Sequence, residues 1–190
     1  MKTARYQKGT SLLEILVAIV VMAIGLLGVA SLQVNALKYQ KTASQRAEAV
    51  QAAYDLGERM RANWGFTVPE NYAAERAQNE TNYRYVGNYA STKSVTHQTK
   101  PYNCEIGLGT PTGCTAAQVA ANDLQEWQRV LELRLVGGAG YIIPVAGQTS
   151  STFDITIMWK EQGFTTVDAT CPSAVAAPIG VRCFTLRYVV

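Results

Sequence analysis

The chain has 190 residues, 48% of them hydrophobic and 16% charged, and its 17 lysines and arginines against 14 aspartates and glutamates give a formal net charge of +3. Lys2, Arg5 and Lys8 account for this whole excess, so the chain from Thr10 onward is formally neutral. A protein that binds nucleic acid through a strongly basic surface needs clustered Lys and Arg. The composition therefore argues against that class and leaves open only a local basic patch.

An apolar segment follows the basic leader. From Ile15 to Leu32 there are eighteen residues without a charge or a proline, which as a helix span about 27 Å, close to the thickness of a hydrocarbon core. A secretory signal peptide has a shorter apolar core and closes with an A-x-A-like site, which is absent here. The sequence thus predicts a transmembrane helix over about residues 12–32.

One carboxylate, Glu14, lies at the start of this segment. A buried acid in a membrane is costly unless it is paired, so by default it indicates a function. The alternative is that Glu14 lies near enough to the end of the segment to reach the water among the lipid headgroups.

The cysteines help to orient the chain. The leader favours a cytoplasmic amino terminus, although Lys38, Lys41 and Arg46 on the other side weaken that argument. Four cysteines lie beyond the segment, and His97, the only histidine, offers no metal-binding pattern. Disulfides are the better interpretation, and they place the remainder outside the cytoplasm. Three connectivities are possible, and short loops favour Cys104 with Cys114 and Cys171 with Cys183.

The helical pattern continues beyond the membrane segment, with apolar residues at three- and four-residue steps and no Gly or Pro from Val34 to Leu56. We predict one helix from about Leu12 to Asn63. In its last turns, DLGERMRAN, Asp55 can pair with Arg59, and Glu58 with Arg61. These pairs are either an ordinary solvated face or part of a functional surface.

The next stretch, residues 64–103, is predicted to be a long irregular loop rich in tyrosine. Its tyrosines either form a contact surface or cover the long helix. Asn79-Glu80-Thr81 matches a glycosylation sequon, which is weak evidence by itself. His97 has no visible catalytic partner, so we interpret it as a surface residue and predict that the protein is not an enzyme.

The C-terminal half predicts a helix followed by strands. Thr115 and Gln118 form a capping box, an apolar stripe runs from Ala120 to Leu135, and Gly137-Gly138 ends the helix. TFDITIMWK and RCFTLRYVV alternate as half-buried strands. A further strand is expected near residues 140–145, and FTTVD could add a fourth. The predicted fold class is α+β, a long N-terminal helix packed on an antiparallel sheet.

The N-terminal segment KGTSLLEILVAIVVMAIGLLG resembles the class III leader and hydrophobic helix of type IV pilins. DLGERMRAN, NDLQEWQRVLELRLVGGAGY and ITIMWKE resemble, more narrowly, the PilV (type IV pilus modification protein) family of minor pilins. Two positions depart from the pilin pattern. Thr10 stands where pilins usually have Phe, and Ser31 stands where major pilins often carry a proline that interrupts the helix.

The resemblance implies a type IV pilin fold with a leader at 1–9, a long helix at 10–63 and a head domain at 64–190. It implies that a prepilin peptidase cuts after Gly9 and methylates Thr10, and that Glu14 neutralises the new amino group during assembly. Within ERMRAN, residues 58–63 at the end of DLGERMRAN, the candidate interaction residues are Glu58, Arg59, Met60 and Arg61.

It also implies the partners and the location. The chain would sit in the inner membrane with a periplasmic head and then enter a pilus with the major pilin and other minor pilins, in some systems linked to a tip adhesin. No small-molecule substrate, cofactor or metal is implied. Two alternatives stay open: a minor pseudopilin of type II secretion, of the GspI kind, and a DNA-receptor pilin. A DNA-binding assay at several salt concentrations distinguishes the DNA-receptor pilin from the other two interpretations, because phosphate contacts make the affinity for DNA depend steeply on salt.

Overall fold

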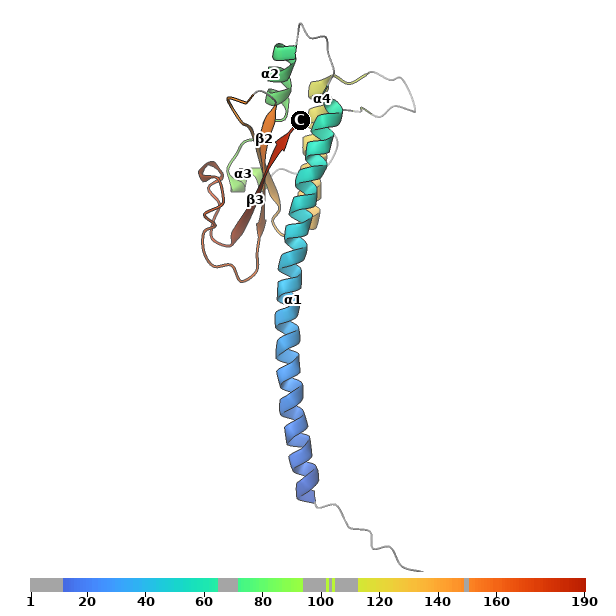
Figure 1. Cartoon of the computed structure of the whole chain (residues 1–190), viewed down its shortest axis with the longest axis vertical. Helices are drawn as coiled ribbons and strands as arrows, with labels where there is room; N and C mark the ends of the chain where they lie inside the picture. Colours follow the sequence, from blue (N-terminus) through green and yellow to red (C-terminus); the bar gives the residue numbers. More distant parts are fainter. Residues whose placement is uncertain (1–11, 65–71, 94–101, 103, 105–112, 149–150) are drawn as a thin grey trace, which may run out of the picture. The chain divides into compact units, whose positions relative to one another are not determined.

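The computed structural model describes residues 12–64, 72–93, 102, 104, 113–148 and 151–190. The elements in chain order are α1 (Leu12–Asn63), α2 (Tyr72–Asn82), α3 (Tyr89–Lys93), α4 (Ala116–Arg134), β1 (Ala139–Pro144), β2 (Thr152–Lys160), the 3-10 turn η2 (Ser173–Val175) and β3 (Val181–Val189) (Figure 1). Two compact units divide the chain, residues 1–43 and residues 44–190. The predicted α+β class and antiparallel sheet are confirmed.

In the first unit, α1 exposes apolar side chains on all sides from Leu12 through Leu37. Among the described residues, α1 is the one helix long and apolar enough to cross a membrane. The described part of α1 begins at Leu12, the first described residue, and the helix ends at Asn63, as periodicity predicts. Good helix formers and the absence of proline explain why α1 continues as one helix into the second unit.

The second unit is the head, built on the last turns of α1. The core side of these turns carries Ala49, Ala53, Leu56 and Met60, all fully buried. α4 runs beside these turns in Figure 1, and the Trp127 indole Nε1 donates a hydrogen bond to the Ala52 carbonyl at 2.9 Å. An aromatic ring from α4 thus fastens the two helices together.

The predicted capping box starts α4. The Gln118 amide donates to the Thr115 hydroxyl at 3.3 Å, and the Thr115 amide donates to the Gln118 side chain at 2.9 Å. The helix ends at Arg134, and Gly137 follows with a φ of 63°. A left-handed conformation there favours glycine, which explains why the chain can turn so soon into β1.

The sheet has the order β1-β2-β3, with both pairs antiparallel. In the register of these pairs, Ile142 lies opposite Ile155, and Ile155 lies opposite Leu186. β2 is the central strand and is buried on both faces, because Thr156 and Met158 are buried as well as Ile155 and Ile157. The prediction of a half-buried β2 is therefore wrong.

A second apolar cluster explains the burial of both faces of β2. One face of the sheet packs against α1 and α4, and the other lies under a cluster that shares no residue with that core. The buried members of the second cluster are Tyr89, Ala139, Tyr141, Met158, Val175 and Val181.

Two glycines allow close packing between elements. A Cβ built on Gly57 would lie 2.5 Å from the Tyr188 ring, and one on Gly140 would overlap the Trp127 ring. Each glycine therefore leaves room for an aromatic side chain from another element. This explains why Gly57 can interrupt a helix in which glycine costs about 1 kcal/mol relative to alanine.

The prediction of an irregular loop over residues 64–103 is wrong within its described part, because α2 and α3 lie there. An ion pair one turn apart, Arg76 Nε to Glu80 Oε1 at 2.9 Å, supports α2. Tyr85 exchanges two backbone hydrogen bonds with Ile142 at the outer edge of β1. The frequent tyrosines and asparagines suggested a loop, but the segment contains two short helices. α2 packs against α4, and α3 packs against β1.

The prediction of a strand at FTTVD, residues 164–168, is also wrong, because the segment contains no strand. Side chains rather than a strand ladder hold it to β3. The Arg182 guanidinium stacks on the Phe164 ring at 3.7 Å from its centroid, and an Asp168 carboxylate oxygen accepts from the Cys183 amide at 3.2 Å. This acceptor occupies a backbone donor that an added strand would need.

Candidate functional site

Glu14 lies in the first turn of α1 and is exposed in the monomer. A carboxylate at this end of a helix interacts favourably with the unpaired amide groups of the first turn. Its neighbours along the helix are apolar and exposed as well. The predicted processing residues, Gly9 and Thr10, lie outside the described residues, so the structure gives no distance between Glu14 and the new amino terminus.

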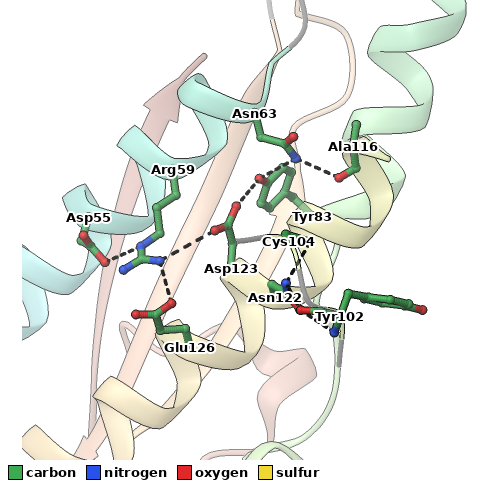
Figure 2. Close-up of polar contacts among 10 residues, drawn as sticks. All are labelled: Asp55, Arg59, Asn63, Tyr83, Tyr102, Cys104, Ala116, Asn122, Asp123 and Glu126. Atoms are coloured by element: carbon green, nitrogen blue, oxygen red, sulfur yellow. Dashed lines mark hydrogen bonds and ion pairs between the residues drawn. The ribbon is translucent and has the colours of Figure 1, made fainter. Parts of the chain in front are cut away.

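Arg59 is the centre of a polar network between α1 and α4 (Figure 2). Its guanidinium pairs with Asp55 at 2.9 Å on its own helix, as i,i+4 spacing predicts. The same guanidinium reaches Glu126 at 3.3 Å and Asp123 at 3.7 Å on α4. Arg59 is half-buried and lies among three carboxylates, of which Asp123 is largely covered while Asp55 and Glu126 remain open to solvent. The network fixes α4 against the end of α1.

Tyr83 connects this network to the segment after α2. Its hydroxyl donates to Asp123 at 2.8 Å and accepts from the Asn63 side chain at 3.0 Å, while the same Asn63 amide donates to the Ala116 carbonyl at 2.9 Å (Figure 2). Burial raises the pKa of Tyr83, and the charge of Asp123 raises it further. Burial also raises the pKa of Asp123, because Tyr83 and Arg59 offset the desolvation only in part.

The other candidates in ERMRAN have different surroundings. Met60 is fully buried and belongs to the core. Arg61 and Glu58 are exposed and form the predicted pair at 3.4 Å. Both also contact β3, because Arg61 donates to the Val189 carbonyl at 3.3 Å and the Tyr188 hydroxyl donates to Glu58 at 2.8 Å. Only Glu58 and Arg61 therefore offer charged groups to a partner from this segment.

Both disulfides have the local connectivity, Cys104 to Cys114 and Cys171 to Cys183. Asn122 of α4 anchors the first one, because its side chain donates to the Tyr102 carbonyl at 2.7 Å and accepts from the Tyr102 amide at 3.0 Å. The same amide nitrogen lies 3.1 Å from the Cys104 sulfur (Figure 2). Sequence reasoning missed Asn122. It looks like any surface asparagine in a helical sequence, and only the structure shows that it is buried.

Asp168 anchors the second disulfide loop. Its carboxylate accepts from the Thr170 amide at 3.0 Å, from the Thr170 hydroxyl at 2.7 Å and from the Cys183 amide at 3.2 Å. Arg182 lies 3.7 Å away. Burial by itself raises the pKa of Asp168, but these hydrogen bonds and the Arg182 charge outweigh it, so the pKa is lowered. The ionised form is therefore the one that the folded loop stabilises.

We expect Asp168→Asn to lower the free energy of unfolding by about 1–2 kcal/mol at neutral pH, because hydrogen bonds to a charged acceptor are lost or weakened. A carboxylate whose pKa falls on folding stabilises the protein above its unfolded pKa, about 3.9, and this contribution disappears as the pH falls through the folded value. The difference between the two proteins should therefore shrink below about pH 4. Calorimetry of the full chain in detergent over a pH series measures it.

The surface pair of Asp154 and Arg187 gives a matched control. Its two hydrogen bonds measure 2.8 Å each, but Arg187 is exposed. Asp154→Asn should therefore cost less than Asp168→Asn, because an exposed ion pair contributes little to stability. A pH-independent effect of Asp168→Asn, or an equal effect of both variants, would contradict the role assigned to the Asp168 charge.

Two further sequence features carry no site in the described structure. Asn79 of the sequon is 7% exposed and lies in α2, so its side chain is not accessible to a glycosyltransferase in the folded head. No group of three or more His, Cys, Asp or Glu side chains within the described ranges is placed to hold a metal ion. His97 lies outside those ranges.

Comparison with known families identifies the N-terminal region. Residues 4–30 match the prokaryotic N-terminal methylation motif. No curated protein and no solved structure gives a significant match. Together with the α+β fold behind a long apolar helix, the motif supports a type IV pilin-type protein that carries a prepilin-peptidase signal. Pilin-type proteins are typically structural rather than catalytic.

Proposed function

We propose that this protein is a minor pilin of a type IV pilus, of the PilV kind, and that it joins other minor pilins to prime assembly at the pilus tip. The observation that carries the proposal is the methylation motif at residues 4–30, which overlaps the start of α1. The two disulfides of the head also support the proposal, because disulfides are typical of proteins outside the reducing cytoplasm.

The role of α1 in this proposal follows from its surface. A helix with exposed apolar side chains all round needs lipid or other helices around it. In the precursor the lipid of the inner membrane supplies these contacts, and the head is periplasmic. In the fibre the apolar segments of neighbouring subunits replace the lipid. Glu14 then pairs with a processed amino terminus, which is a cation at a similar depth in the hydrocarbon environment.

The proposed contact to a partner pilin lies at Glu58 and Arg61. These two charges are exposed on the last turns of α1 and are fixed by β3 through Tyr188 and the Val189 carbonyl. Held in place, they lose little side-chain entropy on binding. Arg59 and Met60 act indirectly, because they hold this end of α1 to α4 and to the core. A tip adhesin is a further proposed partner of the assembled complex.

Processing gives the first test. In cells that make pili, we expect the mature protein to begin at Thr10 and to carry one methyl group on its amino terminus, because the basic leader ending in Gly9, with Glu14 five residues beyond it, resembles a prepilin cleavage site. Intact-mass measurement of the membrane-extracted protein detects both changes. The Gly9→Val variant, which blocks the small-residue cleavage position, should keep its leader and serve as the unprocessed reference. A wild-type protein that keeps its leader in piliated cells would contradict the proposal.

The partners give the second test. Affinity purification of the membrane-extracted protein, followed by mass spectrometry, should recover other minor pilins and the major pilin. Recovery of type II secretion pseudopilins in their place would assign the protein to a secretion pseudopilus. The charge-reversed variant Arg61→Glu should reduce recovery of the direct partner, whereas the exposed control Lys160→Glu on the last residue of β2 should not.

A further inference from the structure

Three cations follow the apolar segment on the side away from the leader, where the positive-inside rule does not predict them. They are Lys38, Lys41 and Arg46, and no acidic residue lies between Glu14 and Glu48. The chain from Thr10 onward is neutral as a whole, so this local excess of positive charge is balanced elsewhere in the head. The membrane anchor alone does not explain it.

The position of the first two cations along α1 is informative. The uncharged run extends from Ile15 to Leu37, which is 23 residues and about 34 Å of helix. A tilted helix of this length fills a hydrocarbon core of about 30 Å. Lys38 then stands at the boundary of the hydrocarbon, and Lys41 lies about 4.5 Å further along the axis. Both fall within a headgroup layer that is about 5–7 Å deep on each side.

The side chains at this level are available for binding. Lys38 and Lys41 are exposed, lie three residues apart on one helix face, and form no ion pair with any residue that the structure describes. Tyr39 between them is 78% exposed. Tyrosine is enriched where the hydrocarbon meets the headgroups, because its ring is apolar and its hydroxyl is polar. All three belong to the unit of residues 1–43.

We propose that Lys38, Tyr39 and Lys41 form a headgroup collar that binds anionic phospholipids at the outer surface of the inner membrane. The proposal rests on the proposed function, which places these residues at that surface. The phosphates neutralise the two ammonium groups, and the tyrosine ring packs at the interface. The collar holds the precursor at a fixed depth, and extraction into a fibre must break these contacts.

The test places the full chain in nanodiscs of phosphatidylcholine, with or without phosphatidylglycerol, and follows hydrogen exchange of the backbone amides in residues 33–43. Exchange should be slower in the discs with phosphatidylglycerol, by up to about 25-fold, because each lysine near an anionic surface contributes about fivefold. The difference should decrease as salt is added. The double variant Lys38→Gln/Lys41→Gln should remove it.

Lys160→Gln in the head is the matched control, because it also removes an exposed lysine, and it should keep the lipid dependence. Equal exchange in the two kinds of disc, or an undiminished difference in the double variant, would overturn the collar. Protection that requires an added pilin rather than phosphatidylglycerol would assign the three residues to a protein contact and overturn it too. The assay needs neither cleavage nor assembly, so its failure is distinguishable from failure of the proposed function.

Discussion

Glu14→Ala should reach the membrane and lose its leader normally but be absent from sheared pili. Removing a charge from an apolar segment makes insertion easier, and the peptidase signal is expected around Gly9. Assembly should fail because the processed amino group would be buried without its partner, and breaking one side of a buried ion pair costs about 3–5 kcal/mol. A penalty of this size lowers incorporation more than a hundredfold. Immunoblots of membrane and sheared-pilus fractions measure it.

Two conservative variants separate charge from hydrogen bonding at this position. Glu14→Gln keeps the length and the polar end but not the charge, so it should recover little assembly. Glu14→Asp keeps the charge on a side chain one methylene shorter, so it should recover part of the assembly. Wild-type amounts of Glu14→Ala in sheared pili would show that Glu14 is only a residue at headgroup level, and the pairing proposal would be wrong.

Trp127→Ala should be the most destabilising single change in the head. Trp127 is fully buried, packs against Gly140 and donates to the Ala52 carbonyl. Truncating a buried aromatic side chain of this size leaves a cavity and costs about 3–5 kcal/mol. That is a large part of the stability of a typical domain, about 5–15 kcal/mol. Urea unfolding of the full chain in detergent, monitored by hydrogen exchange of the β2 amides, measures the loss.

Trp127→Phe and Leu133→Ala are the controls for this prediction. The phenylalanine keeps part of the ring but loses the hydrogen bond, so we expect an intermediate cost of about 1–3 kcal/mol. Leu133 lies on the same helix but is 74% exposed, and its removal should change stability by less than about 0.5 kcal/mol. Equal effects of Trp127→Ala and Leu133→Ala would show that Trp127 does not join α4 to α1.

Local signals predicted the elements whose pattern is complete within a few turns. The continuity of α1 followed from a helical pattern without proline, and the start of α4 from the reciprocal bonds of Thr115 and Gln118. The ion pairs of Asp55 with Arg59 and of Glu58 with Arg61 followed from helical spacing. Such signals need no knowledge of the rest of the fold, because the interacting groups are close in the chain.

The predictions that failed concern segments whose environment comes from distant parts of the chain. α3 has only five residues, and both short helices contact other elements of the head, α2 with α4 and α3 with β1. FTTVD has the composition of a strand, but Asp168 occupies the Cys183 amide where a strand would pair. Tertiary contacts override a propensity of a few tenths of a kcal/mol per residue.

The sequence by itself determined the membrane-length helix, the methylation motif, the capping box and the alternation that marks the strands, because each is a local pattern along the chain. Only the tertiary structure decided that Arg59 turns toward Asp123 and Glu126. It likewise decided that Met60 is buried while Arg61 stays exposed. The direction that a helical side chain faces depends on which surface the rest of the chain covers, and α4 and β3 supply that cover from positions far along the sequence.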